Sequence, residues 1–116
     1  MRAGLAFILL LTIQGGIGCL YLKRSGQEDG LRQALSVLRS EIAQFTADHQ
    51  RGPAFLEDLV ASGYLKEIPI DPITGRNDTW TIETVGDEWA WGMSAIVNVH
   101  SGSASLDSDG RPYSSW

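Results

Sequence analysis

The sequence predicts an α+β fold in which one long N-terminal helix packs on a small antiparallel β-sheet. Three observations predict it: an uncharged apolar run over Ala3–Leu22, a helical repeat of apolar residues from Leu31 to Phe45, and two alternating segments after residue 79. A chain of 116 residues has room for one small domain and one appended segment. We therefore expect a transmembrane or leader segment over residues 1–24 and a globular domain over residues 25–116.

The run Ala3–Leu22 carries no charge and lies between Arg2 and Lys23–Arg24. A helix of about 20 residues spans about 30 Å, the thickness of a bilayer core. The run predicts a membrane-spanning helix with its amino end in the cytoplasm. Two alternatives remain open: a cleaved signal, which lacks a clear small-residue cleavage site, and a lipoprotein signal ending at Cys19, where Gly16 replaces the usual aliphatic residue.

The first half of the globular domain reads as two helices. Ser25–Gly30 is polar and contains glycine, which indicates a hinge. Apolar residues then recur at spacings of four and three, as on the buried face of an amphipathic helix: Leu31, Leu35, Leu38, Ile42 and Phe45. We expect this helix to end at His49–Gly52, with Gly52 as a left-handed cap. A second short helix is expected over Pro53–Ser62, closed by Gly63.

The second half of the domain reads as a loop, a hairpin and a tail. Pro69 and Pro72 favour an ordered irregular loop, in which Asp71 is expected to accept hydrogen bonds rather than act as a catalytic acid. Strand alternation follows over residues 80–85 and 89–99, with a turn at Gly86–Asp87. The second strand should bury its odd-numbered face, which comprises Trp89, Trp91, Met93, Ala95, Val97 and Val99.

The aromatic residues are expected to fill the core. The four tryptophans are Trp80, Trp89, Trp91 and Trp116. If Trp89 and Trp91 faced outward instead, they would mark a protein-binding patch. The tail from residue 101 ends on aromatic residues, which predicts that it is anchored.

Charge and composition exclude several function classes. Three of the nine basic residues precede Ser25 and all 14 acidic residues follow it, so the globular part carries a net charge of −8. Such a surface does not suit nucleic acid. One cysteine excludes an internal disulfide framework and a cysteine zinc cluster. An enzyme is not expected, because His49 suits a helix end and His100, beside Ser101, lacks a visible third partner.

One block of the loop carries a resemblance to a known family. Gly63–Gly75 reads GYLKEIPIDPITG, and the chain closes with Ser101–Ser103 and Tyr113–Trp116. These features resemble type IV pilin-like proteins, especially the major pseudopilin (protein G) of type II secretion. The resemblance implies a non-enzymatic subunit in the bacterial inner membrane, with its C-terminal domain in the periplasm. Its partners would be the bilayer, the inner-membrane secretion machinery and other pseudopilins, with which it would form a short periplasmic filament that assists protein export.

The resemblance also implies processing of the N-terminus. Family members begin with a basic leader that ends in glycine, so cleavage would fall between Gly4 and Leu5. The fifth mature residue, a glutamate in the family, would here be Leu9, and no glutamate precedes Glu28. This departure fits a tip-type minor subunit or an unprocessed relative. The alternative function is a monomeric, single-span periplasmic binding or adaptor module.

One acidic motif is a candidate metal site. Asp107 and Asp109 lie two residues apart before Gly110, and calcium prefers such oxygen ligands. The third acid and the distant glutamate of an EF-hand are absent. Because major pseudopilins bind calcium in their C-terminal loop, the resemblance implies calcium at Asp107 and Asp109, with backbone carbonyls near Leu106 or Ser103. The alternative is an Asx-type turn with solvated acids.

Overall fold

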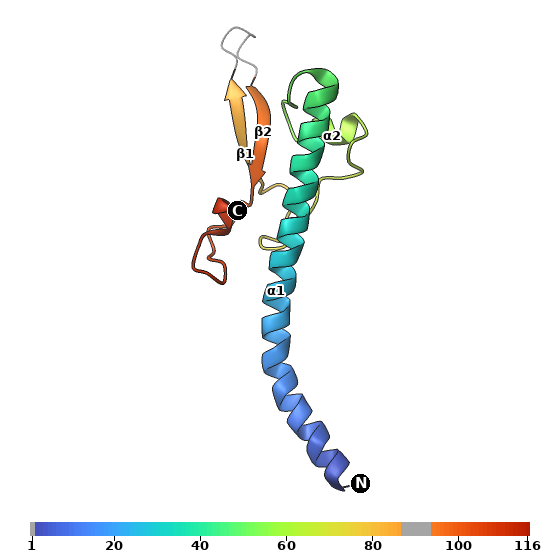
Figure 1. Ribbon diagram of the computed structural model, residues 1–116, viewed down its shortest axis with the longest axis vertical. Coiled ribbons are helices and arrows are strands. Elements are labelled where there is room, and N and C mark those ends of the chain that lie inside the picture. The colour runs from blue at the N-terminus through green and yellow to red at the C-terminus, as the bar shows by residue number, and fades with distance from the viewer. Residues whose placement is uncertain (1, 87–93) are drawn as a thin grey trace.

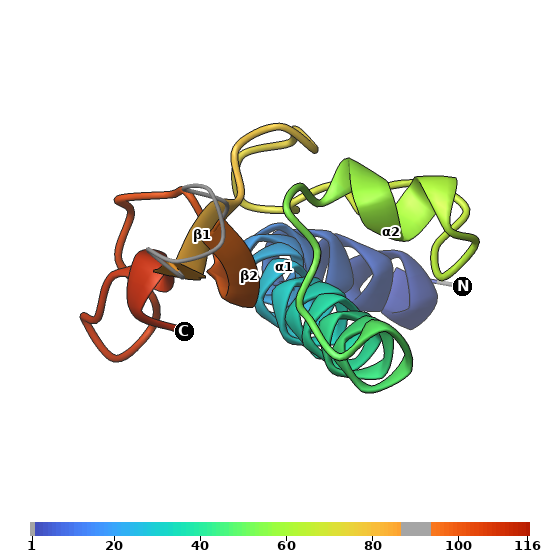
Figure 2. The ribbon, with the colours of Figure 1, turned by 90° about the horizontal axis from the view of Figure 1, so that it is seen from above.

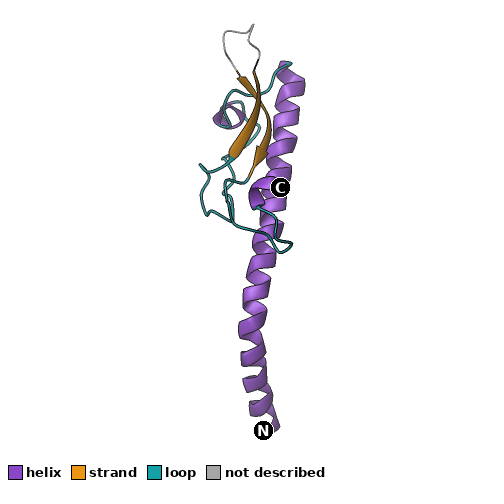
Figure 3. Ribbon diagram, turned by 90° about the vertical axis from the view of Figure 1, so that its left-hand side faces the viewer, coloured by secondary structure: helices purple, strands orange, loops and turns teal. Residues whose placement is uncertain are grey.

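The computed structural model describes residues 2–86 and 94–116, and the side chains of 25–86 and 94–116. It contains α1 (Arg2–His49), α2 (Glu57–Ala61), the antiparallel strands β1 (Thr81–Gly86) and β2 (Ser94–His100), and the 3₁₀ turn η1 (Tyr113–Ser115). The molecule measures 76 × 29 × 19 Å, with α1 as its long axis and the sheet beside the C-terminal half of α1 (Figures 1 and 3). The predicted combination of a long helix and a small antiparallel sheet is confirmed.

The predicted hinge at Ser25–Gly30 is wrong, because α1 runs through these residues as one helix of 48 residues. Two of the polar side chains here contact distant segments. Gln27 donates to the carbonyl of Pro72, and the buried Glu28 bonds to Ser108 and Tyr113 of the C-terminal segment (residues 101–116). A Cβ on Gly30 would lie 3.4 Å from Cγ of Pro72, so the helix surface is in close contact with the loop at this point.

The predicted apolar stripe of α1 is confirmed as the centre of the core. Leu31, Leu35, Leu38 and Ile42 are buried, and Phe45 packs against them while half-buried. The stripe meets residues from β2, α2 and the loops: Ile96, Val99, Leu56, Leu59, Trp80 and Tyr113. Figure 2 shows the sheet and the C-terminal segment on one side of α1 and α2 on the other. The core therefore surrounds the C-terminal half of α1.

Gly52 has a different role from the predicted left-handed cap. The positive φ at the end of α1 belongs to Gln50, at 60°. A Cβ on Gly52 would collide with the carbonyl oxygen of Ile96, and the amide of Ile96 donates to the carbonyl of Pro53 at 2.7 Å. Glycine is therefore required here because the chain after α1 runs directly against β2.

The second helix is shorter than predicted and occupies Glu57–Ala61. Before it, the Asp58 carboxylate accepts the amides of Ala54 and Phe55 at 3.1 and 3.0 Å, which holds a turn in place of helix. Gly63, with φ of 83°, closes the helix as predicted.

The sheet contains a bulge, and at the bulge the predicted odd-numbered buried face is wrong for Val97 and confirmed for Val99. Glu83 pairs with Asn98 and Thr84 with Ile96, so Val97 is the additional residue of β2. The bulge leaves Ile96 and Val99 buried and Val97 52% exposed. The predicted Trp89, Trp91 and Met93, together with Asp87 of the predicted turn, lie outside the described residues.

Candidate functional site

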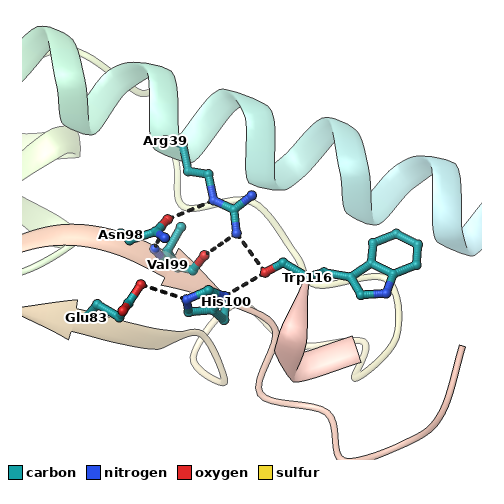
Figure 4. Close-up of polar contacts among 6 residues, drawn as sticks. All are labelled: Arg39, Glu83, Asn98, Val99, His100 and Trp116. Atoms are coloured by element: carbon teal, nitrogen blue, oxygen red, sulfur yellow. Dashed lines mark hydrogen bonds and ion pairs between the residues drawn. The ribbon is translucent and has the colours of Figure 1, made fainter. Parts of the chain in front are cut away.

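A polar junction joins α1 to the sheet and to the C-terminal segment, and Arg39 lies at its centre (Figure 4). Its Nε donates to Oδ1 of Asn98 at 2.8 Å. Its Nη2 donates to the carbonyl of Val99 at 3.0 Å and to the backbone oxygen of Trp116 at 2.7 Å. The planar guanidinium presents several donors in fixed directions, so one side chain can hold three segments together.

His100 is the second member of the junction. Its Nδ1 lies 2.6 Å from the backbone oxygen of Trp116, and its Nε2 lies 2.8 Å from Oε2 of Glu83 (Figure 4). The bond from His100, and after it the bond from Asn98, hold the pKa of Glu83 below its usual value. The ring thus connects the edge strand β1 with the C-terminal segment.

Glu28 anchors the C-terminal segment to α1 at a second point, ahead of Trp116. Its carboxylate accepts the Ser108 hydroxyl at 2.8 Å, the Ser108 amide at 3.1 Å and the Tyr113 hydroxyl at 2.9 Å. The carboxylate is buried, so these donors replace the water that it would otherwise bind. The Tyr113 ring in turn belongs to the core.

The first predicted metal ligand, Asp107, is buried and directs its carboxylate into its own loop. Oδ1 accepts the amides of Asp109 and Arg111 at 2.8 and 2.9 Å, and Oδ2 accepts the indole Nε1 of Trp116 at 2.7 Å. The Arg111 amide, followed by the Trp116 indole, lowers the pKa of Asp107. This is the geometry of an Asx-type turn.

The donors around Asp107 do not fit a calcium shell as they stand. Three N–H groups occupy acceptor positions that a cation would need, and Asp109 is exposed. Among residues 25–86 and 94–116, no three Asp, Glu, His or Cys side chains gather as metal ligands would. Calcium at Asp107 and Asp109, with carbonyls near Leu106 or Ser103, therefore stays a prediction that requires these N–H donors to move.

Asp71 fixes the loop, as its position between two prolines predicts. It is fully buried, and its carboxylate accepts the amide of Ile73 at 2.8 Å and the hydroxyl of Ser101 at 2.5 Å. Nearby, the indole Nε1 of Trp80 donates to the carbonyl of Pro69 at 2.8 Å. The loop block that carries the resemblance is thus tied to the segment that follows β2.

A groove runs along α1 beside the junction. It encloses about 510 Å³ between α1 and Trp116, and its walls are Arg32, Leu35, Ser36, Arg39 and Trp116. The guanidinium carbon of Arg32 lies 4.8 Å from the centroid of the Trp116 ring, within the range of a cation–π contact. Trp116 therefore forms one wall of this groove, and its side chain is held by Arg32 over the ring and by Asp107 at the indole nitrogen.

The remaining predicted residues divide between the described and undescribed parts. His49 is exposed at the end of α1, with its ring 4.2 Å from that of Phe45. Gly4, Leu5 and Cys19 lie in α1, ahead of the residues whose side chains are described. Where side chains are described, no helix is both long and apolar enough to cross a membrane, and Ala3–Leu22 falls outside that range.

Glu28 and Arg39 are the functional residues that sequence reasoning missed. A local signal was present for Arg39, which directly follows Leu38 and lies one turn from Leu35, so it borders the buried stripe. Glu28 has no such local signal, since it lies in the predicted hinge and its partners are 80 and 85 residues away.

The chain matches no family model, no curated protein and no solved structure.

Proposed function

We propose that this chain is a structural, pilin-like subunit of a type II secretion or related type IV pilus-like machine. The observation that carries the proposal is α1, a single helix from Arg2 to His49. Its first part contains the uncharged run Ala3–Leu22, and its second part carries the sheet and the loop. This arrangement suits a subunit that is anchored by one half of a helix and displays a domain on the other.

The apolar half of α1 supports both membrane insertion and assembly. A run of about 20 uncharged residues is long enough to span a bilayer core. The same apolar surface can leave lipid and pack against neighbouring helices in a filament core. The proposed location is the bacterial inner membrane, with residues 25–116 in the periplasm, and the proposed partners are the bilayer, the secretion machinery, other copies and other pseudopilins.

The junction suits a mechanical role. Glu28 and Arg39 fix the C-terminal segment to α1, and Asp71 fixes the loop through Ser101. Because α1 has no break at Ser25–Gly30, movement of the anchored half is transmitted directly to the domain. A filament subunit that pushes exported proteins outward needs this stiffness. The proposal involves no catalytic step, and the charge of −8 beyond residue 24 does not suit a nucleic-acid partner.

The first test is an intact mass with N-terminal peptide mapping on protein extracted from its native membrane. Cleavage after Gly4, with a methyl group on the Leu5 amine, is the expected result. A Gly4→Val variant is the matched control and should remain uncut. An intact Met1 would contradict processing, and a diacylglycerol on Cys19 would contradict a spanning helix.

Assembly is tested separately by chemical crosslinking in the same membranes. A filament subunit should give a ladder of species beyond the dimer. A monomer crosslinked to one other protein would instead favour the single-span adaptor. Crosslinking on intact membranes is necessary because the proposed contacts depend on the anchored half of α1.

A further inference from the structure

The ring of His100 lies between two groups that can only accept hydrogen bonds. Nδ1 faces the backbone oxygen of Trp116 at 2.6 Å, and Nε2 faces the carboxylate of Glu83 at 2.8 Å. A neutral imidazole has one N–H, whereas an imidazolium has two. Both contacts are therefore hydrogen bonds only when the ring carries a proton on each nitrogen (Figure 4).

We propose that His100 is a pH-sensitive latch, which in its doubly protonated form ties Trp116 to β1 and on losing a proton loosens this end of the C-terminal segment. The residues joined by the ring come from β1 and from the C-terminal segment, and His100 itself lies at the end of β2. This inference concerns the globular domain alone and stands whether or not the chain forms a filament.

The charged groups that face the ring act in opposite directions. Glu83, from β1, accepts a bond from the ring and favours the imidazolium. Arg39, from α1, donates to the same Trp116 oxygen as His100 and disfavours a second positive charge there. Glu83 bonds to the ring directly, whereas Arg39 meets it only through the shared oxygen of Trp116.

Loss of one proton turns one of the two contacts into a repulsion. A ring lone pair would then face a carbonyl or carboxylate oxygen at 2.6 or 2.8 Å. Arg39 would be left to hold the oxygen of Trp116 without the ring. Trp116 also forms a wall of the groove beside Arg32, so loosening of Trp116 would alter this wall of the groove. The latch therefore holds when the ring carries a proton on each nitrogen and opens when it loses one.

Hydrogen–deuterium exchange of the full chain in detergent micelles tests the latch. The readout is the peptide that covers residues 105–116, in which the Trp116 amide bonds to the carbonyl of Tyr113 at 3.1 Å. After correction for the intrinsic pH dependence of exchange, protection should fall about tenfold between about pH 5.5 and 8.5, as expected for losing one hydrogen bond of ordinary net strength.

Two variants make the test specific. His100→Gln should abolish the pH dependence, whereas His49→Gln, which changes the exposed histidine at the end of α1, should keep it. An unchanged profile in His100→Gln, or a flat profile in the native chain, would overturn the proposal. If His100→Gln does not fold, the ¹⁵N chemical shifts of the His100 ring in the native chain provide the test. We expect both ring nitrogens to carry a proton at about pH 5.5. An unprotonated ring nitrogen at a pH where the 105–116 peptide is still protected from exchange would contradict the latch.

Discussion

Replacing Arg39 with methionine should destabilise the domain by about 2–3 kcal/mol. Methionine keeps the apolar stem and the helix propensity of arginine but removes every donor. The guanidinium makes three hydrogen bonds, to Asn98, Val99 and Trp116. A bond from a charged group contributes about 1.5 kcal/mol net at the low end, so three give about 4.5 kcal/mol. Partial exposure reduces this sum, because water replaces some of the lost bonds.

Thermal unfolding of the full chain in micelles, followed by near-ultraviolet circular dichroism, measures this loss. For a domain of this size, each kcal/mol lowers the melting midpoint by about 4–8 °C, so a decrease of about 8 °C or more is expected. The matched control is Arg76→Met, since the Arg76–Asp78 pair is 66% and 58% exposed and should contribute no more than about 1 kcal/mol. Equal midpoints for the two variants would refute the role assigned to the junction.

Three further predictions concern single groups in the same domain. Gly102→Ala should lower the free energy of unfolding by about 2 kcal/mol or more, because a Cβ there would collide with the carbonyl oxygen of Thr79. Gly26→Ala, in a helix with open space around the position, should raise it by about 0.5–1 kcal/mol. Chemical denaturation measures both changes. The pKa of Glu83 is lower in the folded chain than in the unfolded chain, so its charged form stabilises the fold at any pH above the unfolded pKa. This stabilisation is lost as the pH falls through the folded pKa, and Glu83→Gln should remove the corresponding decrease in melting midpoint at acid pH. Calcium must displace N–H donors to reach Asp107 and Asp109, so we expect the same midpoint in a chelator and in millimolar calcium, and a rise with calcium would restore the predicted metal site.

The elements that could be predicted from the sequence are those whose buried face follows from a regular spacing of apolar residues. The stripe from Leu31 to Ile42 is buried as expected, since a repeat of three and four residues has only one face that can meet a core. Asp71 also accepts hydrogen bonds as predicted, because an aspartate in a turn commonly accepts the amide two residues further along the chain.

The features that sequence could not predict depend on contacts between distant segments. Nothing in the alternation of β2 marks Val97 as the bulged residue, and the one-residue shift left Val99 buried as predicted but buried Ile96 in place of Val97. Likewise, Gly52 reads as a helix cap in its local context. Its actual reason, the approach of Ile96, exists only once β2 is in place.

The two anchors of the C-terminal segment form a pair that local pattern rules do not recognise. Positions 28 and 39 are three helical turns apart, so Glu28 and Arg39 project from nearly the same face of α1, about 16 Å apart along the axis. One anchor is an acceptor for Ser108 and Tyr113, and the other is a donor to Trp116. A segment held at two points on one helix face cannot slide along it, because movement in either direction breaks the bonds at both points. In a pushing filament, a load along α1 would therefore reach the tail through both anchors together.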